Sequence, residues 1–270
     1  MSQTGTSEMA ASTTQPARPE LSLAVPCYNE EEVLRDTVVQ LARTFAEAHV
    51  DLELVLVDNG STDGTAAVID HLIAEGLPVV KVTVDTNRGY GHGVLAGLRA
   101  CRGELVGFIH ADGQVDPRDV LKVYSTARRA PEPTLAKVRR RFRMDGWTRK
   151  LISIAFNLGT NVVFPGLRSI DINGSPKVLP RAALERMNLV SQDWFLDCEM
   201  LLKARQMGLA VVEFNVLAQP RAGGKSKVHL EACWEFAWNL LKYRLGRGAP
   251  LAPPQRDSAE PPVALSHSDR

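Results

Sequence analysis

Short apolar segments alternate along the chain with segments whose apolar residues recur at helical spacing. Apolar positions three or four residues apart predict an amphipathic helix over residues 33–48, and further helices are expected up to residue 73 and over residues 89–100 and 199–207. The expected strands are the apolar runs at residues 21–25, 52–57, 79–84 and 105–109. This alternation predicts an α/β fold in which helices cover both faces of a mainly parallel sheet.

The two ends of the chain differ in composition from its middle. Residues 1–20 and 249–270 are rich in proline, serine and alanine without apolar periodicity, so both are expected to be disordered tails. Residues 21–230 are expected to form one domain. Residues 231–248 are expected to form a C-terminal amphipathic helix, because Trp234, Trp238, Leu241 and Leu245 repeat at helical spacing. Such a helix could lie on a membrane interface, although the pattern favours packing against the domain.

Composition excludes several classes of protein. The 270 residues are 44% hydrophobic and carry a formal net charge of +1, so no general attraction to nucleic acid is expected. The four cysteines form no CxxC pair, which indicates buried thiols in a reducing compartment rather than a zinc site or disulfides. With no visible signal peptide and no convincing membrane span, the expected location is cytoplasmic, with membrane association compatible with the sequence.

Polar loops follow all four expected strands. Any one of them could be an ordinary turn, but the carboxyl ends of parallel strands share one edge of the sheet, where ligands bind. Asp58 and Asn59 could bond a base or ribose, and Tyr28 could stack on a base. Arg88 and Gly89 stand at the start of an expected helix, where backbone N–H groups favour phosphate. Together the loops indicate a nucleotide site.

The loop after the fourth expected strand carries two oxygen donors. Asp112 and Gln114 alternate along it and point the same way if the chain is extended. Carboxylate and amide oxygens suit Mg²⁺ or Mn²⁺ carrying a diphosphate. The alternative for this segment alone is a simple turn.

These segments together resemble family 2 glycosyltransferases of the GT-A fold. The resemblance rests on the order and spacing of Pro26–Glu32, Val57–Asp63, Asn87–Gly91 and Ala111–Gln114. Three later segments resemble the dolichyl- and polyprenyl-phosphate sugar synthase branch, namely Arg149–Ser153, Asp171–Lys177 and Arg221–Lys227. The resemblance covers about residues 21–230 and implies a single Rossmann-like mixed sheet, mainly parallel, with helices on both faces.

The resemblance also implies roles for individual residues. The metal would be held by Asp112 and Gln114. Catalysis would involve Asp112, Asp197, Arg149 and Arg221. The nucleotide would be bound by Pro26, Tyr28, Glu30, Val57, Asp58, Asn59, Arg88, Gly89 and Ala111. Phosphate oxygens of donor or acceptor would be met by Arg139, Arg149, Arg221, Ser226 and Lys227.

The chain departs from the family pattern at two positions. His110 stands where the metal motif usually begins with an acid, and it could bind metal, contact the ribose or act as a spacer. Asn59 replaces a second acid, which leaves the preferred base open because an amide both donates and accepts hydrogen bonds. A general base, where one is needed, would be Asp197 or else Asp193. The alternative is that these acids cap the helix that follows.

The function implied is metal-dependent transfer of a hexose, with inversion, from a GDP- or UDP-linked sugar to a polyprenyl phosphate. A basic run between Lys137 and Lys150 precedes an uncharged apolar stretch, which would suit a phosphate with an apolar tail, although a core helix with a basic flank gives the same pattern. The alternatives are a soluble glycosyltransferase with a hydroxyl or amine acceptor, an inactive nucleotide-binding subunit, and a nucleotidyltransferase, which the acidic Pro26–Glu32 loop disfavours. A homodimer is compatible with the sequence.

Overall fold

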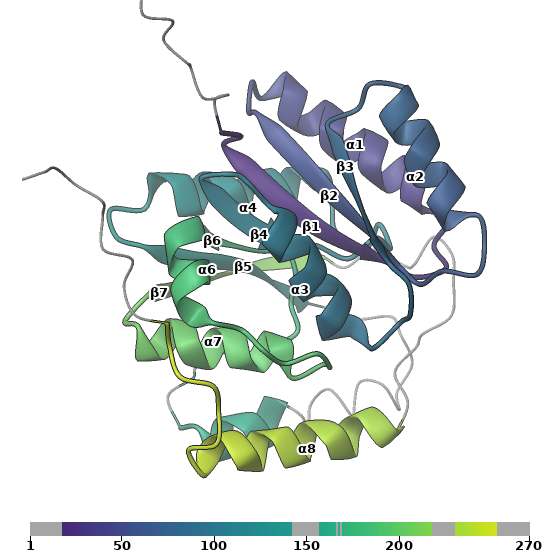
Figure 1. The fold of residues 1–270 in the computed structure, drawn as a ribbon. Helices are drawn as coiled ribbons and strands as arrows, with labels where there is room; N and C mark the ends of the chain where they lie inside the picture. The colour runs from purple at the N-terminus through teal and green to yellow at the C-terminus, as the bar shows by residue number, and fades with distance from the viewer. Residues whose placement is uncertain (1–17, 142–156, 166, 168, 218–229, 253–270) are drawn as a thin grey trace, which may run out of the picture.

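A seven-stranded mixed sheet forms the centre of the protein (Figure 1). The computed structural model describes residues 18–141, 157–165, 167, 169–217 and 230–252. The strand order is β3-β2-β1-β4-β6-β5-β7. The strands are β1 (Leu21–Cys27), β2 (Leu52–Asn59), β3 (Val79–Val84), β4 (Leu105–Phe108), β5 (Thr134–Arg141), β6 (Lys177–Pro180) and β7 (Ala210–Leu217). Only β6 runs antiparallel to its neighbours, which confirms the expected mixed, mainly parallel sheet.

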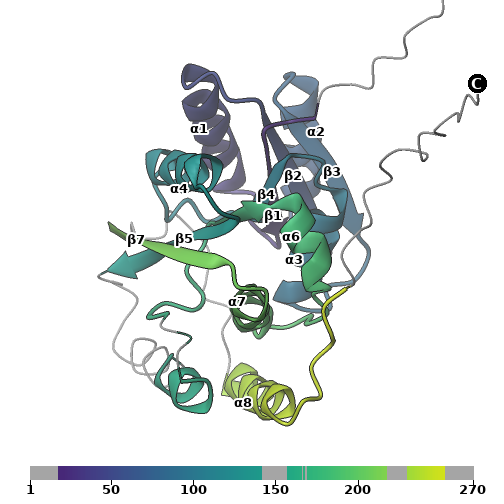
Figure 2. The ribbon, with the colours of Figure 1, turned by 90° about the vertical axis from the view of Figure 1, so that its left-hand side faces the viewer.

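Helices cover both faces of this sheet (Figure 2). One face carries α1 (Leu34–Glu47), α2 (Thr65–Ala74) and α4 (Pro117–Arg129), and the other carries α3 (Tyr90–Ala100), α6 (Arg181–Met187) and α7 (Leu196–Gln206). Successive residues of a strand point to opposite faces, so Leu23 lies in the apolar cluster under α1, α2 and α4 while its neighbour Ala24 lies in the cluster under α3. The first four strands follow their apolar runs to within two residues.

The first strand is longer than expected. A loop was expected to begin at Pro26, yet β1 extends to Cys27 because Pro26 pairs with Val57 of β2. Pairing of β1 with β4 ends at Ala24, opposite Phe108. The missing N–H of Pro26 therefore falls where β1 has only one neighbouring strand, a position at which proline is tolerated.

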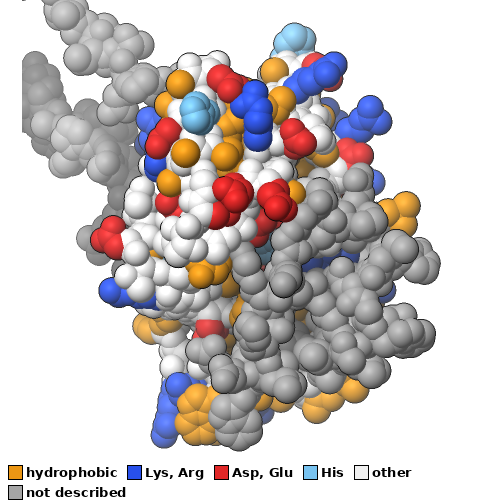
Figure 3. Space-filling model, turned by 90° about the vertical axis from the view of Figure 1, so that its right-hand side faces the viewer, with side chains coloured by type: hydrophobic (Ala, Val, Ile, Leu, Met, Phe, Trp, Pro, Cys, Tyr) orange, Lys and Arg blue, Asp and Glu red, His pale blue; other side chains and the backbone are white. Residues whose placement is uncertain are grey.

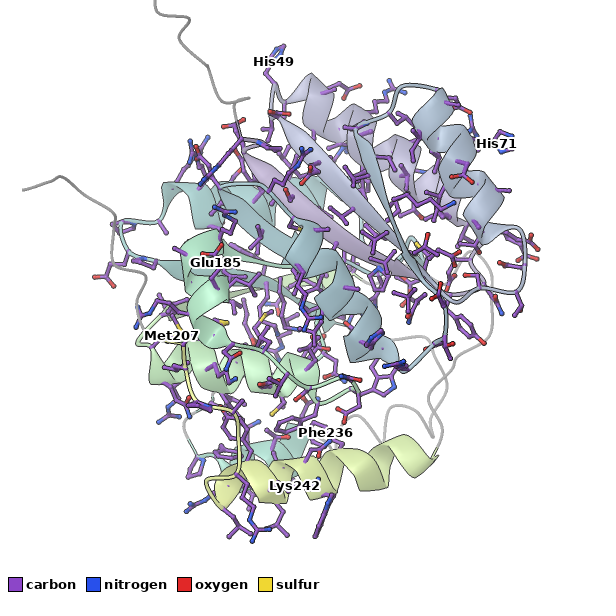
Figure 4. All side chains as sticks on the ribbon, viewed as in Figure 1. His49, His71, Glu185, Met207, Phe236 and Lys242 are labelled. Atoms are coloured by element: carbon purple, nitrogen blue, oxygen red, sulfur yellow. The ribbon has the colours of Figure 1, made fainter. Side chains whose placement is uncertain are left out.

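The last helix, α8 (Leu230–Arg244), packs against the rest of the domain. Phe236 and Leu240 are buried in the same apolar cluster as α7. Phe236 lies on the side of α8 turned toward α7 (Figure 4), and its ring centroid is 5.4 Å from that of Phe195. A short helix over residues 157–163 lies beside α8, where Phe164 contacts Tyr243. Within the described ranges, no helix combines the length and the apolar character needed to cross a bilayer.

Close packing of α3 on the sheet depends on Gly97, and replacing it should be destabilising. A Cβ atom at Gly97 would lie 2.7 Å from that of Ala24 and 2.8 Å from Cγ2 of Val57. We expect Gly97→Ala to lower the free energy of unfolding by about 1–3 kcal/mol, measured by urea denaturation. Gly159→Ala is the matched control, since a Cβ there meets nothing within 4 Å. It should not destabilise, because alanine favours a helix over glycine by roughly 1 kcal/mol.

Candidate active site

The carboxyl ends of β1 and β2 are linked into one rim by hydrogen bonds between their loops. Asn29, which adopts a left-handed conformation with φ 54°, accepts from the backbone N–H of Thr62 at 2.8 Å. The backbone N–H of Asn29 donates to Ser61 Oγ at 3.2 Å. Asp58 Oδ1 accepts from the N–H of Ser61 at 3.0 Å. Figure 3 views this side of the molecule, where acidic side chains gather near the middle of the face.

The proposed nucleotide residues on this rim differ in accessibility. Pro26, Tyr28 and Glu30 are half-buried at the edge, and Asp58 is buried. The side chain of Val57 faces α3, so a contact of this residue with a ligand would come from its backbone. Roles for these residues in binding a nucleotide stay predictions.

Asn59 and Gly89 are engaged with the protein itself. Asn59 Nδ2 donates to the carbonyl of Gly89 at 3.2 Å, while Asn59 Oδ1 is buried and finds no partner in the part of the chain that the structure describes. Gly89 has φ 118°, and a Cβ atom there would lie 2.7 Å from the carbonyl oxygen of Gln192. The same carbonyl accepts from the N–H of His92 at 2.9 Å. The start of α3 therefore packs on the segment before α7, and Arg88 beside it is exposed. Direct phosphate contacts there stay predictions.

Asp112 and Gln114 lie together in the loop between β4 and α4. Both side chains are nearly buried, and Asp112 Oδ1 accepts from the N–H of Gln114 at 3.2 Å. Gly113 between them has φ 64°, a conformation that favours glycine. The loop is held down at Ala111, whose carbonyl accepts from Thr37 Oγ1 at 3.1 Å.

This donor set fits a divalent ion shared with a substrate. Among the described residues, no three His, Cys, Asp or Glu side chains come together as a metal site. The protein would thus supply only part of a coordination shell, through the oxygens of Asp112 and Gln114. Mg²⁺ and Mn²⁺ in such sites take the remaining oxygens from water and substrate phosphates.

An aromatic group that sequence reasoning did not assign lies beside this loop. Tyr90 Oη is 3.0 Å from His110 Nε2, and the Tyr90 ring stacks on Trp194 with centroids 4.4 Å apart. Burial lowers the pKa of His110 to about 4, although the charge of Asp112 opposes this. Burial and the charge of Asp197 raise the pKa of Tyr90 well above its ordinary value. At neutral pH the imidazole and the phenol are therefore uncharged.

A buried ion pair joins α7 to β6. Asp197, on the first turn of α7, pairs with Lys177 at the start of β6, and both side chains are at most 1% exposed. Among the described residues, Asp197 Oδ2 has no hydrogen-bond partner. Because Asp197 is paired and buried, its role as a general base stays a prediction. Asp193 instead accepts from the N–H of Phe195 and from Asn239 of α8, which links α8 to this segment.

A second buried group joins β5 to the segment before β6. The Arg140 guanidinium bonds both oxygens of Asp171, at 2.9 and 3.0 Å. Lys137 Nζ pairs with Glu213 at 3.1 Å, and burial lowers the pKa of Lys137 to about 8, with the charge of Lys177 acting in the same direction. Sequence reasoning treated Lys137 and Arg140 as part of a basic run. No local signal in the sequence indicated that Asp171 and Glu213 would pair with them, because these acids lie 31 and 76 residues away.

The Arg140–Asp171 pair gives a testable dependence of stability on pH. Burial alone would raise the pKa of Asp171, but the Arg140 guanidinium lowers it well below its ordinary value. The pair therefore stabilises the fold fully above about pH 4 and loses this effect as the pH falls toward the folded-state pKa. The difference in free energy of unfolding between wild type and Asp171→Asn should be large at about pH 7 and shrink at about pH 2.5, measured by urea denaturation. A difference that stays constant with pH would contradict this account.

The remaining predicted phosphate residues are only partly placed. Arg139 is half-buried on β5, opposite Asn215 of β7. Four others lie outside the described residues: Arg149, Arg221, Ser226 and Lys227. The side chain of Trp234, expected in the amphipathic stripe, also lies outside them.

Residues 22–187 match the family described as glycosyl transferase family 2. The chain belongs to this family. The resemblance seen in the sequence is thus confirmed.

Known relatives of this family 2 member include lipid-phosphate enzymes. The undecaprenyl-phosphate 4-deoxy-4-formamido-L-arabinose transferase of Aeromonas hydrophila is 27% identical over 222 residues, 82% of this chain and 66% of that protein. The dolichyl-phosphate beta-glucosyltransferase of Trichomonas vaginalis is 30% identical over 241 residues, 84% of this chain and 73% of that protein. The chain spans between 42% and 66% of the length of three bacterial undecaprenyl-phosphate transferases that it matches.

A solved structure confirms the GT-A fold. Glucosyl-3-phosphoglycerate synthase from Mycobacterium tuberculosis, in complex with Mn²⁺ and UDP-glucose, superposes with a TM-score of 0.67. The two chains are 22% identical, and the match covers 86% of this chain and 80% of the synthase.

Proposed function

We propose that this family 2 glycosyltransferase moves a hexose, with inversion, from a GDP- or UDP-linked sugar to a polyprenyl phosphate. The observation that carries the proposal is the pairing of Asp112 and Gln114 at the carboxyl edge of the sheet, next to the polar loops after β1 and β2. A carboxylate and an amide at this edge suit a cation bridging a donor diphosphate.

The chemistry requires that charge on the leaving nucleoside diphosphate be neutralised as the bond to the sugar breaks. A divalent ion held by Asp112 and Gln114 would supply that neutralisation. The loops after β1 and β2 would orient the nucleoside through Glu30 and Asp58. The acceptor oxygen would attack the anomeric carbon from the face opposite the leaving group. A phosphate acceptor is already anionic and needs no general base, which agrees with the burial of Asp197 in an ion pair.

A lipid acceptor is supported by two kinds of observation. Relatives at 27% and 30% identity carry names of enzymes that use undecaprenyl or dolichyl phosphate. The outer side of α8 and the residue that follows the helix also expose apolar side chains, which we term the α8 stripe: Trp238 (50% exposed), Leu241 (48%) and Leu245 (63%). Lys242 Nζ lies 5.5 Å from the centre of the Trp238 ring. Exposed apolar side chains beside a basic group suit contact with an anionic membrane.

A transfer assay tests the proposed function. The purified protein with Mn²⁺ and labelled GDP- or UDP-hexoses should form a chloroform-soluble glycolipid when a polyprenyl phosphate is present. Product with a water-soluble hydroxyl or amine acceptor alone would favour the alternative glycosyltransferase. Failure to release nucleoside diphosphate from every donor, with or without acceptor, would contradict both activities.

The α8 stripe gives a prediction about membrane binding. We expect Leu241→Ser with Leu245→Ser to weaken binding to vesicles containing anionic lipid by about tenfold or more, because each leucine buries its apolar surface in the interface. Co-sedimentation with the vesicles measures this. The control is Ile73→Ser, which removes an apolar side chain that is 41% exposed on α2, at the opposite side of the sheet. Equal losses in both variants would contradict a role for the stripe.

A further inference from the structure

One edge of the sheet is formed by β7, at the opposite end from β3 (Figure 1). β7 pairs with β5 along its whole length, and among the described residues no strand pairs with its other side. Two of its apolar side chains are exposed, Val211 (37%) and Leu217 (70%). Leu217 is the most exposed large hydrophobic side chain in the described ranges. An edge of this kind presents backbone N–H and C=O groups to a further strand.

The two edges of the sheet differ in their protection against such pairing. Natural sheets protect edge strands with lysine, proline or a bulge. β3 carries Lys81 in its interior, which pairs with Asp70 at 2.7 Å. β7 has eight residues without lysine, arginine or proline, and its register with β5 is unbroken. The single charge of β7, on Glu213, is already paired with Lys137 inside the protein. β7 thus lacks the features that protect an edge.

A cavity of about 490 Å³ lies beside the first half of β7, on the face toward α7. Four apolar side chains line it, alongside Arg205 and Glu213: Leu167, Leu201, Leu209 and Val211. Leu217 projects from the same face of β7 as Val211, because alternate side chains of an unbroken strand point the same way. The chain therefore carries an exposed leucine at one end of β7 and an apolar cavity at the other end.

A two-fold axis at Phe214 would bring these two features together. In an antiparallel pair of β7 strands centred on Phe214, Val211 lies opposite Leu217 of the partner subunit, and residues 211–217 of both strands pair. The leucine of each copy then meets the cavity of the other. A register centred on Glu213 would instead place two like charges opposite one another, which is unfavourable. Complementarity about such an axis is the mark of an isologous interface, which closes at two copies.

We propose that β7 is a dimerisation edge, where two copies of this chain pair antiparallel about an axis at Phe214 and each Leu217 enters the partner's cavity. The two seven-stranded sheets join into one continuous sheet. Backbone hydrogen bonds hold the strands together, and the leucines fix the register. The inference is independent of the proposed function, since no residue of β7 is assigned to the donor or the metal.

Analytical ultracentrifugation of the full chain, with a reducing agent present, tests the proposal. Wild type should sediment as a dimer at micromolar concentration. Leu217→Asp should raise the dissociation constant by about a hundredfold or more, because two buried leucines are lost from each dimer. Thr83→Asp, at an exposed position on the opposite edge strand β3, is the matched control and should leave the dimer intact. A monomeric wild type, or a dimer that Leu217→Asp does not weaken, would overturn the inference.

Engineered cysteines test the register. The double variant Val211→Cys with Leu217→Cys should form a covalent dimer on oxidation with diamide, because Cα atoms opposite one another on antiparallel strands lie about 4.5–5.5 Å apart, within reach of a disulfide. Each single variant should stay uncoupled, since the three described native cysteines are buried. Val211→Cys with Asn215→Cys suits the register centred on Glu213 and should couple far more slowly.

Two further outcomes would contradict a β7 dimer. Faster coupling of the Val211→Cys with Asn215→Cys variant would rule out the axis at Phe214. Slow hydrogen exchange at the outer amides of β7 in a monomeric protein would show that a segment of the same chain covers the edge. Either result would leave the proposed function intact, because the transfer assay does not depend on β7.

Discussion

The Asp112→Asn enzyme should transfer sugar about 10²- to 10³-fold more slowly than wild type, the size of effect seen when a group that stabilises developing charge is removed. Asparagine keeps the shape of the side chain and can still accept from the N–H of Gln114, so the loop should remain folded. The charge that attracts the divalent ion is lost. Steady-state rates of nucleoside diphosphate release at saturating donor, with Mn²⁺ varied, measure the effect.

A neighbouring acid provides the matched control for this experiment. Asp116 is the N-cap of α4 and accepts from the N–H of Arg118 at 2.8 Å. Asparagine is as good an N-cap as aspartate, so Asp116→Asn should leave both rate and stability near wild type. An Asp112→Asn enzyme as active as the Asp116→Asn enzyme would rule out Asp112 as the metal-binding carboxylate.

Lys177→Met should lower the free energy of unfolding by about 3–5 kcal/mol, because it leaves the carboxylate of Asp197 buried without its partner. Removing both charges is a different change. The double variant Lys177→Met with Asp197→Leu should recover most of the loss, since well-packed apolar residues can replace a buried pair with little penalty. Urea denaturation of wild type, both single variants and the double variant measures the coupling.

A surface pair serves as the comparison. Arg43 and Glu47 also form an ion pair, but their side chains are 79% and 65% exposed. Solvent screens such a pair, so Arg43→Met should leave the midpoint of unfolding unchanged. Losses in the two single variants of the buried pair that simply add in the double variant would show that Lys177 and Asp197 are not energetically coupled.

The first half of the fold could be predicted from the chain pattern because it is built from local signals. Each apolar run up to residue 109 is long enough to be a buried strand, and each intervening helix has its own periodicity. The second half could not be predicted in this way. In β5, Lys137 and Arg140 belong to the basic run that the sequence suggested for a phosphate with an apolar tail, yet Glu213 and Asp171 pair with them inside the protein. Those partners are 76 and 31 residues away.

The sequence by itself determined the alternation of strands and helices, the polar loops at the ends of the first four strands, and the Asp112–Gln114 pair, because each depends on residues close together in the chain. Only the tertiary structure decided that Asn59 donates a hydrogen bond to Gly89, that Tyr90 is hydrogen-bonded to His110, and that Lys177 forms an ion pair with Asp197. These contacts join separate elements across the sheet and between layers. Their partners are chosen by packing and by the need to satisfy buried polar groups, neither of which leaves a periodic trace in the sequence.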